Sequence, residues 1–258
     1  MKTSMIGVLA CFAIACVVFF NEVRSQGTAG SDATIESRYL IDLPTAGMIS
    51  HGNVALDFEF FQSDGMLAGV SVGAFNRLLL GISLGGSNII GTDRPTWNSL
   101  PGIQIKLRLL EETVFIPAIA VGFSSQGKET YVDQFDRYTI KSLGFYAVGS
   151  KNYRAMGFLG LHGGINYSFE RSDGDDDINV FVGAEKTMGP FLSLLGEYDV
   201  GINDSNRDAL GRGRGYFNLG LRASVGNGFM LAFVLKDVLR NQQDYSLANR
   251  VIQLEYVK

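Results

Sequence analysis

Strict alternation of apolar and polar residues is the feature that most constrains the fold of this chain. In the stretch GIQIKLRLLEE, residues 102–112, positions 103, 105, 107 and 109 are apolar, and positions 104, 106 and 108 are polar. Successive side chains of a β-strand point to opposite faces, so the segment predicts a strand with one apolar and one polar face. In a soluble sandwich the apolar face would lie in the core. In a transmembrane barrel it would meet lipid, and the polar face would line the lumen.

Twelve segments of strand length follow residue 50, and no convincing amphipathic helix interrupts them. They span residues 52–62, 65–74, 77–86, 102–111, 114–124, 139–149, 156–169, 177–187, 191–202, 214–224, 229–238 and 249–257. Most of them alternate in the same way, whereas 139–149 has apolar residues on both faces. A composition with 32 Gly and 5 Pro suits a large sheet, because Gly permits close approach and tight bends.

The lengths of the connections distinguish a barrel from a sandwich. After a first hairpin at 63–65, which is short where a long loop is due, short turns and long loops alternate along most of the chain. Outer-membrane barrels have short periplasmic turns and longer external loops. We therefore expect an all-β, antiparallel, up-and-down transmembrane barrel of about twelve strands, with positions 103, 105, 107 and 109 facing lipid. A soluble exported β-protein is the alternative.

The N-terminus has the features of a secretory signal peptide. Lys2 supplies positive charge, residues 5–20 form an uncharged apolar run, and Val23 and Ser25 occupy the positions before the cleavage site. The apolar run is shorter than the roughly 20 residues that a membrane-spanning helix needs. We expect the mature chain to begin near Gln26.

The chain is predicted to divide into three parts. Residues 1–25 would be the signal peptide, 26–50 an N-terminal periplasmic or plug segment, and 51–258 the barrel. A lipoprotein signal that ends at Cys16 is the alternative for the first part. Both cysteines, Cys11 and Cys16, precede residue 26, so the predicted mature chain has no thiol for a disulfide or a metal.

Charged residues fall repeatedly on the predicted inner face. The acidic members are Asp57, Glu59, Glu170, Glu185, Glu197, Asp199 and Glu255, and the basic members are Arg77, Lys106, Arg108, Arg222 and Lys236. Because an unpaired buried charge is costly, we expect these groups to pair in an ionic network that fills and rigidifies the lumen. The alternative is an open pore whose charged rings select the solute.

His162 is the only histidine in a predicted strand. An enzyme would place it beside a nucleophile, but Ser168, which faces the same way, is about 20 Å along the strand. We therefore assign His162 to the lumen charge network and expect no catalytic residue, cofactor or metal site. An outer-membrane hydrolase that uses His162 is the alternative.

Four segments resemble YjbH-like bacterial outer-membrane proteins. They are LPTAGMI (43–49), PGIQIK (101–106), KSLGFYAV (141–148) with SKNY (150–153), and LGLHGGINYS (159–168). The resemblance spans most of residues 40–258. It implies an outer-membrane barrel, in some relatives linked to exopolysaccharide production or export, and it carries no catalytic residues.

These observations together predict a class of function. We expect a non-enzymatic barrel of the bacterial outer membrane that serves exopolysaccharide or envelope biology as a narrow conduit or a scaffold. The alternative is a diffusion channel for small solutes. The expected partners are outer-membrane lipid, a polysaccharide or small solute, and the barrel-assembly machinery. The net charge of −4 gives no reason to expect nucleic acid.

Overall fold

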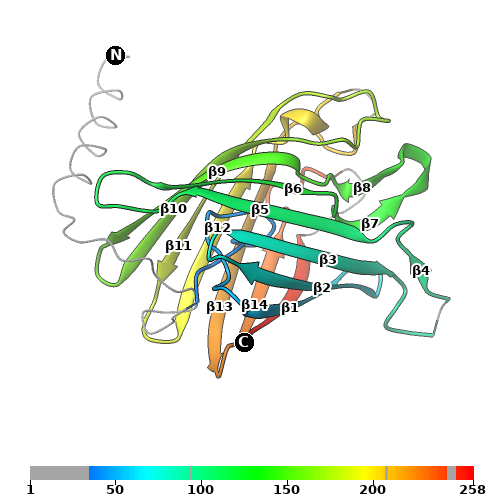
Figure 1. The fold of residues 1–258 in the computed structure, drawn as a ribbon. Coiled ribbons are helices and arrows are strands. Elements are labelled where there is room, and N and C mark those ends of the chain that lie inside the picture. The colour runs from blue at the N-terminus through cyan, green and yellow to red at the C-terminus, as the bar shows by residue number, and fades with distance from the viewer. Residues whose placement is uncertain (1–34, 93, 207–208, 243–247) are drawn as a thin grey trace, which may run out of the picture.

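A computed structural model describes residues 35–92, 94–206, 209–242 and 248–258, and in these ranges twelve long antiparallel strands close into a barrel (Figure 1). The predicted signal peptide lies outside the described residues. The wall strands are β1 (Val54–Phe61), β2 (Gly65–Ala74), β3 (Leu78–Ser87), β5 (Gly102–Leu110), β6 (Ala118–Ser124), β9 (Gly144–Arg154), β10 (Phe158–Tyr167), β11 (Asn179–Thr187), β12 (Leu192–Asp199), β13 (Tyr216–Gly226), β14 (Phe229–Lys236) and β15 (Asn249–Val257). The first strand pairs with the last, from Ala55 opposite Val257 to Phe60 opposite Ile252. The predicted barrel is confirmed.

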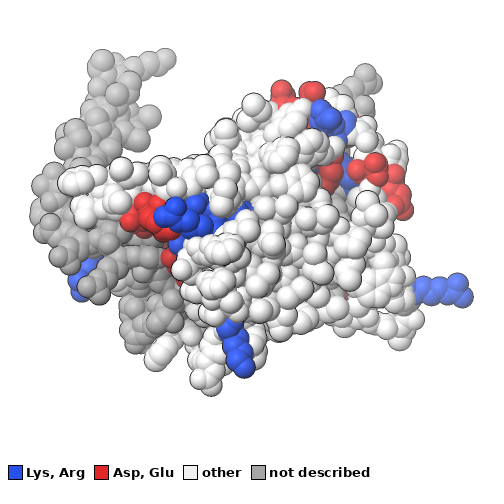
Figure 2. All heavy atoms as spheres, viewed as in Figure 1, with Lys and Arg blue, Asp and Glu red and all other residues white. Residues whose placement is uncertain are grey.

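The outer face of the wall is apolar. Ile103, Ile105, Leu107 and Leu109 are each 41–50% exposed, whereas Lys106 between them is fully buried. The face shown in Figure 2 is largely uncharged over the wall strands, and Lys, Arg, Asp and Glu gather toward its ends. The orientation predicted from the alternation is therefore correct. Among the helices in the described ranges, none has the length and apolar character needed to cross a membrane.

The long connections lie at one end of the barrel and carry extra elements. β4 (Thr96–Trp97) pairs with β3, and β7 (Lys128–Val132) pairs with β8 (Arg137–Ile140) in a separate small sheet. These elements project at the right of Figure 1, away from the short turns. Two short 3₁₀ helices, η1 (Asp133–Phe135) and η2 (Ile202–Asp204), lie in the same set of connections. The sequence predicted neither β4 nor the β7–β8 pair.

One predicted strand is displaced along the chain. The segment expected over 139–149 forms β9 from Gly144 to Arg154, because residues up to Ile140 belong to β8. Gly144 has a φ of 61°, and a Cβ at this position would lie 2.0 Å from the carbonyl oxygen of Tyr167. Only glycine fits both requirements, so β9 begins there.

Residues 35–50 run inside the barrel, as the blue trace in Figure 1 shows. The backbone folds back on itself: Tyr39 bridges to Pro44, the Leu40 N–H donates to the Leu43 carbonyl at 2.9 Å, and the Thr45 N–H donates to the Arg38 carbonyl at 3.0 Å. We call residues 35–50 the lumen hairpin. Its turn is at residues 40–43, and its C-terminal end leads into β1.

Apolar side chains of the lumen hairpin pack against inward-facing apolar residues of the wall. Leu43 and Ala46 lie in one buried cluster with Ala118, Ala120, Tyr146, Val148 and Phe181. Leu40 and Ile41 lie in a second, and Met48 and Ile49 in a third at the start of β1. The inner face is therefore not uniformly polar. The apolar residues on both faces of 139–149 have this cause, since Tyr146 and Val148 contact the hairpin.

Candidate functional site in the barrel lumen

Lys106 of β5 binds the backbone of the lumen hairpin. Its Nζ donates to the carbonyl oxygens of Arg38, Thr45 and Gly47 at 3.0, 3.1 and 3.2 Å. The Lys106 side chain is fully buried. Three carbonyl dipoles thus surround one ammonium group and supply the acceptors that a buried cation requires.

Glu197 of β12 binds the turn of the hairpin, and its charge is opposite to that of Lys106. Its carboxylate accepts hydrogen bonds from the successive N–H groups of Ile41, Asp42 and Leu43 at 3.0–3.1 Å. The Asn218 side chain donates a further bond at 2.8 Å. Consecutive backbone amides that converge on one anion form a nest, and here the anion belongs to the barrel wall.

Arg222 of β13 holds the first strand of the hairpin. Its guanidinium donates to the carbonyl oxygens of Tyr39, at 3.0 Å, and Leu40, and to the hydroxyl of Ser37 at 2.9 Å. Glu185 lies 3.7 Å from the same guanidinium. Glu185 is therefore linked to the hairpin indirectly, through Arg222.

Two groups of opposite charges join the side chains of the hairpin to the wall. Arg38, which is fully buried, contacts both Asp57 and Glu255 at 2.5 Å. These two acids face each other across the β1–β15 pair. Their proximity would be unfavourable without the guanidinium between them.

The second group lies nearer the long connections. Lys236 of β14 contacts Asp42 of the hairpin at 2.7 Å and also contacts Glu59 of β1. Lys128 of β7 reaches the same two carboxylates, at 3.7 Å from Asp42 and 2.7 Å from Glu59. The positive charges of the two lysines therefore compensate the negative charges of Asp42 and Glu59 in a largely buried site.

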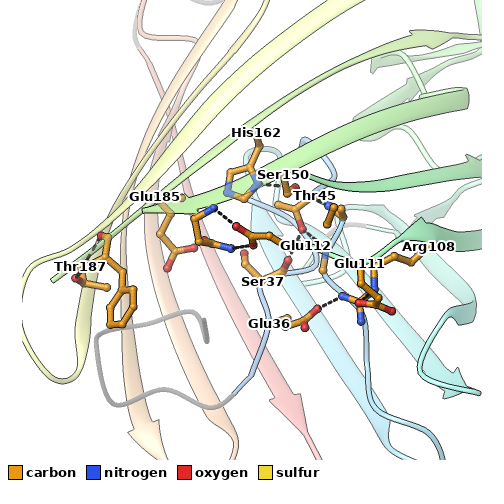
Figure 3. Close-up of a pocket in the computed structure, with 16 residues that line it drawn as sticks. Glu36, Ser37, Thr45, Arg108, Glu111, Glu112, Ser150, His162, Glu185 and Thr187 are labelled. Atoms are coloured by element: carbon orange, nitrogen blue, oxygen red, sulfur yellow. Dashed lines mark hydrogen bonds and ion pairs between the residues drawn. The ribbon is translucent and has the colours of Figure 1, made fainter. Parts of the chain in front are cut away.

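A cavity of about 90 Å³ lies beside the hairpin at the end of the short turns, and Figure 3 shows the residues around it. Arg108 of β5 contacts Glu36 of the hairpin at 2.6 Å, and Glu36 accepts the Met48 N–H at 2.9 Å. On the other side of the hairpin lies a cavity of about 150 Å³, lined in part by Tyr39, Gln104, Gln126, Lys128 and Gln253. Residues of the hairpin thus line both cavities.

His162 is linked to the hairpin through the hydroxyl group of Ser150. Its Nδ1 lies 2.8 Å from the Ser150 hydroxyl, which accepts the Ala46 N–H at 2.8 Å. Ser168, the partner weighed from the sequence, instead accepts the Glu170 N–H at 3.2 Å. Ser150 is 5% exposed, and its oxygen binds the Ala46 N–H of the hairpin.

The structure brings most of the predicted lumen residues together around the hairpin. Ten lie there, directly or through one neighbour: Asp57, Glu59, Lys106, Arg108, His162, Glu185, Glu197, Arg222, Lys236 and Glu255. Asp199 lies at the end of β12, where it accepts bonds from the Asn179 side chain and the Gly201 N–H.

Two predicted members lie elsewhere. Arg77 lies on the turn between β2 and β3, and its side chain is 57% exposed beside Glu111 at 3.5 Å. Glu170 lies in the connection 168–178 and accepts the N–H groups of Tyr138 and Ser142. Both corrections have one cause: these residues lie just beyond a strand end, where alternation no longer fixes the direction of a side chain.

Sequence reasoning missed the hairpin's own charged residues and their partner Lys128. Glu36, Arg38 and Asp42 belong to no wall strand, so the period of two did not select them. One signal was available. Asp42 interrupts the apolar run Leu40–Leu43, and an acid within such a run commonly has a buried partner.

A buried ionic cluster joins three of the long connections. Arg137 of β8 contacts Asp173 at 2.5 Å and Asp204 at 2.7 Å, and Lys141 contacts Asp173 at 2.8 Å. Asp173 lies in 168–178 and Asp204 in η2. We call this set of four residues the loop cluster. It couples three connections that lie far apart in the sequence.

The loop cluster is expected to weaken in acid. Burial would raise the pKa of Asp173, but the hydrogen bonds and charges of Lys141 and Arg137 outweigh it and hold that pKa below the ordinary value. A carboxylate with a lowered folded pKa stabilises above its unfolded pKa, about 3.9, and loses this contribution as pH falls through the folded value. Hydrogen exchange in residues 168–178 should therefore accelerate, relative to intrinsic rates, below about pH 4.

Two comparisons separate Asp173 from other acids in this test. The variant Asp173→Asn should show weak protection of 168–178 at neutral pH as well. Burial raises the pKa of the neighbouring Glu170, so Glu170 becomes neutral at a higher pH than Asp173, and its protonation does not account for the loss at the lowest pH. Protection that is unchanged down to pH 2.5 would contradict the prediction.

No protein-family model matches this chain, and no curated protein matches it. Among solved structures, the KdgM porin in complex with disordered oligogalacturonate matches with a TM-score of 0.50 at 10% identity, over 79% of this chain and 98% of that chain. The barrel has the porin fold. The NanC porin, with a TM-score of 0.44 and 9% identity, covers 80% of this chain and 98% of its own. Omp33 of Acinetobacter baumannii matches with a TM-score of 0.36 at 9% identity, over 80% of this chain and 95% of its own.

The porin fold and the apolar outer face together place the protein in the bacterial outer membrane. A closed sheet satisfies its backbone groups internally, which a lipid environment requires. The long connections then form the external end and the short turns the periplasmic end. The cavity with Glu36 and His162 therefore faces the periplasm, and both ends of the lumen hairpin lie on that side.

Proposed function

We propose that the protein is a porin-like channel for small polar solutes and that the lumen hairpin is its plug. The observation that supports this proposal is the position of the hairpin across the lumen. It contacts wall residues of β1, β5, β12, β13, β14 and β15, and its residues line both cavities. In this proposal the predicted segment 26–50 is the plug, of which the structure describes residues 35–50.

The solute that we propose is an oligosaccharide. The cavity of about 150 Å³, which we call the external cavity, is lined by amide and hydroxyl groups of Gln104, Gln126, Gln253 and Ser83. Such groups are suited to bind sugar hydroxyls. The KdgM porin was solved with oligogalacturonate, which is consistent with a sugar ligand. The resemblance to YjbH-like proteins supports a role in exopolysaccharide biology, as a conduit rather than as a scaffold.

The hairpin is proposed to leave toward the periplasm. Its C-terminal end is joined to β1 at the periplasmic end, where Met48 and Ile49 contact Ala55 and Val257. The hairpin therefore has covalent attachment on the periplasmic side and only non-covalent contacts at its turn. Withdrawal of the turn would join the two cavities into one aqueous path.

The single-channel conductance of the variant Leu43→Glu tests whether the protein is a channel. Leu43 is buried beside Tyr146 and Phe181, and its N–H binds Glu197. A second carboxylate there is desolvated and repelled by Glu197, so the hairpin should leave. In a planar bilayer, mature wild-type protein should be silent for most of the recording, and the variant should give reproducible current steps. The volume-conserving variant Leu43→Met should remain silent.

A reversible cross-link controls the same experiment. Residues 17–258 contain no cysteine, and the Ala46 nitrogen lies 2.8 Å from the Ser150 oxygen. The pair Ala46→Cys with Ser150→Cys, added to Leu43→Glu, should conduct when reduced and fall silent when oxidised. Folding is checked by heat-modifiable migration and the cross-link by thiol titration. If every folded variant is silent, the channel is contradicted and the scaffold function is favoured.

A further inference from the structure

Beside its contacts to hairpin side chains, the wall of the lumen makes many hydrogen bonds to the hairpin's backbone. Lys106 and Arg222 donate to carbonyl oxygens, and Glu197 accepts from N–H groups. Gln253 donates to the Ile41 carbonyl at 3.2 Å, and Ser150 accepts the Ala46 N–H. We propose that the lumen wall is a binding site for the main chain of a peptide hairpin, and that residues 35–50 are its resident ligand.

Two buried charges support this assignment. Lys106 and Glu197 are at most 2% exposed, and within the described ranges neither forms an ion pair with a side chain of opposite charge. Lys106 is neutralised by three carbonyl dipoles and Glu197 by three amide dipoles. Buried charges are normally paired with opposite charges. Here the complementary partner of both is a peptide backbone.

The positions of the two charges match the geometry of a tight hairpin. Lys106 contacts carbonyls at 38, 45 and 47, on both arms, whereas Glu197 contacts the amides at 41–43 in the turn. A cation between the arms and an anion at the turn recognise a chain that reverses within four residues. A simple ion offers only one kind of group, whereas a peptide hairpin presents carbonyl oxygens between its arms and N–H groups at its turn. The ligand class is therefore a short peptide with a tight turn and apolar side chains beside it.

A peptide supplied from outside should enter this site when the resident hairpin is displaced. The cavity of about 90 Å³ at the periplasmic end is lined by Thr45, Ala46, Gly47 and Ser150. The hairpin therefore borders solvent-accessible space on that side. This inference deepens the proposed function, on which it rests for the role of the hairpin as a plug. Peptide binding itself can be measured without any current.

The experiment uses the full mature chain with Leu43→Glu, which keeps every wall residue. Release of the resident hairpin is checked with trypsin, because Arg38 is buried in the wild-type protein and becomes a cleavage site when the hairpin leaves. A dye-labelled synthetic peptide with the sequence of residues 35–50 is then titrated against the folded barrel in detergent, and fluorescence anisotropy is recorded. We expect saturable binding to Leu43→Glu and little binding to the wild-type protein.

Methylation of single backbone nitrogens tests recognition of the main chain. A peptide N-methylated at Ile41 or Leu43 keeps all its side chains but loses a bond to Glu197. It should bind at least about tenfold more weakly, since hydrogen bonds to a charged group are among the strongest. Methylation at Ser50, whose amide makes none of the wall contacts described above, is the matched control. Adding Glu197→Ala to the barrel, which removes the acceptor, should remove most of the difference between the methylated and unmethylated peptides.

The outcomes separate this inference from the proposed function. A barrel that binds the peptide but never conducts contradicts the channel alone. A Leu43→Glu barrel that conducts and exposes Arg38 to trypsin but does not bind the peptide overturns the peptide site alone. Equal affinity of the methylated and unmethylated peptides also overturns it. If Leu43→Glu does not fold, Ala46→Glu displaces the hairpin at another buried position and carries the same titration.

Discussion

Lys106→Met is expected to lower the free energy of unfolding of the barrel by about 2–6 kcal/mol, since each buried acceptor that loses its donor costs about 1–3 kcal/mol. Methionine fills a similar volume, but it removes the Lys106 donor from the carbonyl oxygens of Arg38, Thr45 and Gly47, of which the Arg38 carbonyl still accepts the Thr45 N–H. Buried carbonyls without partners are costly. Urea unfolding of the lipid-embedded barrel measures the loss, and tryptic cleavage after Arg38 reports release of the hairpin.

Lys186→Met is the matched control for this substitution. The Lys186 ammonium also donates to two carbonyl oxygens, those of Ala155 at 2.7 Å and Met156 at 2.8 Å, but these lie on an exposed turn. Water can replace the lost donor there, so the change in the free energy of unfolding should stay within about 0.5 kcal/mol. Equal losses in the two variants would contradict a special role for the lumen contacts of Lys106.

Lys236→Met is expected to destabilise the barrel by a similar amount, about 3–5 kcal/mol. Asp42 and Glu59 are both more than 90% buried, and without Lys236 they share Lys128 as their cation. One negative charge is then left uncompensated inside the barrel. Urea unfolding again measures the loss, and the exposed pair of Arg77 with Glu111 gives a control, since Arg77→Met should cost less than about 1 kcal/mol.

A double-mutant cycle identifies the cause of the loss in Lys236→Met. The double variant Lys236→Met with Glu59→Gln removes one charge of each sign and leaves Lys128 opposite Asp42. It should therefore be more stable than the sum of the two single changes indicates, by at least about 1 kcal/mol. Additive losses would show that Lys236 and Glu59 are not coupled and would contradict the balanced group of four charges.

The sequence predicted the wall of the barrel well because the wall obeys a local rule. Residues 103–109 alternate without error, and the structure places their apolar members outside and Lys106 inside. The rule failed where neighbours set the direction of a side chain. Arg77 and Glu170 lie beyond strand ends, and β9 begins at Gly144 because residues 137–140 pair with β7.

The candidate site could be predicted only in part. Lys106, Glu197 and Arg222 were predicted to face inward and to pair with other charged side chains of the wall. All three are at most 5% exposed, and Arg222 lies 3.7 Å from Glu185. Glu197 and Lys106 instead bind backbone groups that are more than 50 residues away along the chain. The loop cluster was missed for a related reason, since Arg137, Asp173 and Asp204 meet only when three connections fold together.

By itself, the sequence determined that this chain forms a closed barrel with a lipid-facing exterior and long connections at one end. Alternation and connection length are properties of neighbouring residues, so they can be read without tertiary contacts. Only the tertiary structure decided that residues 35–50 occupy the lumen and that the charges of the wall serve to hold them. The physical reason is that Lys106, Arg222 and Glu197 bind main-chain N–H and C=O groups. Every residue but proline carries both groups, and they leave no trace in the pattern of side chains.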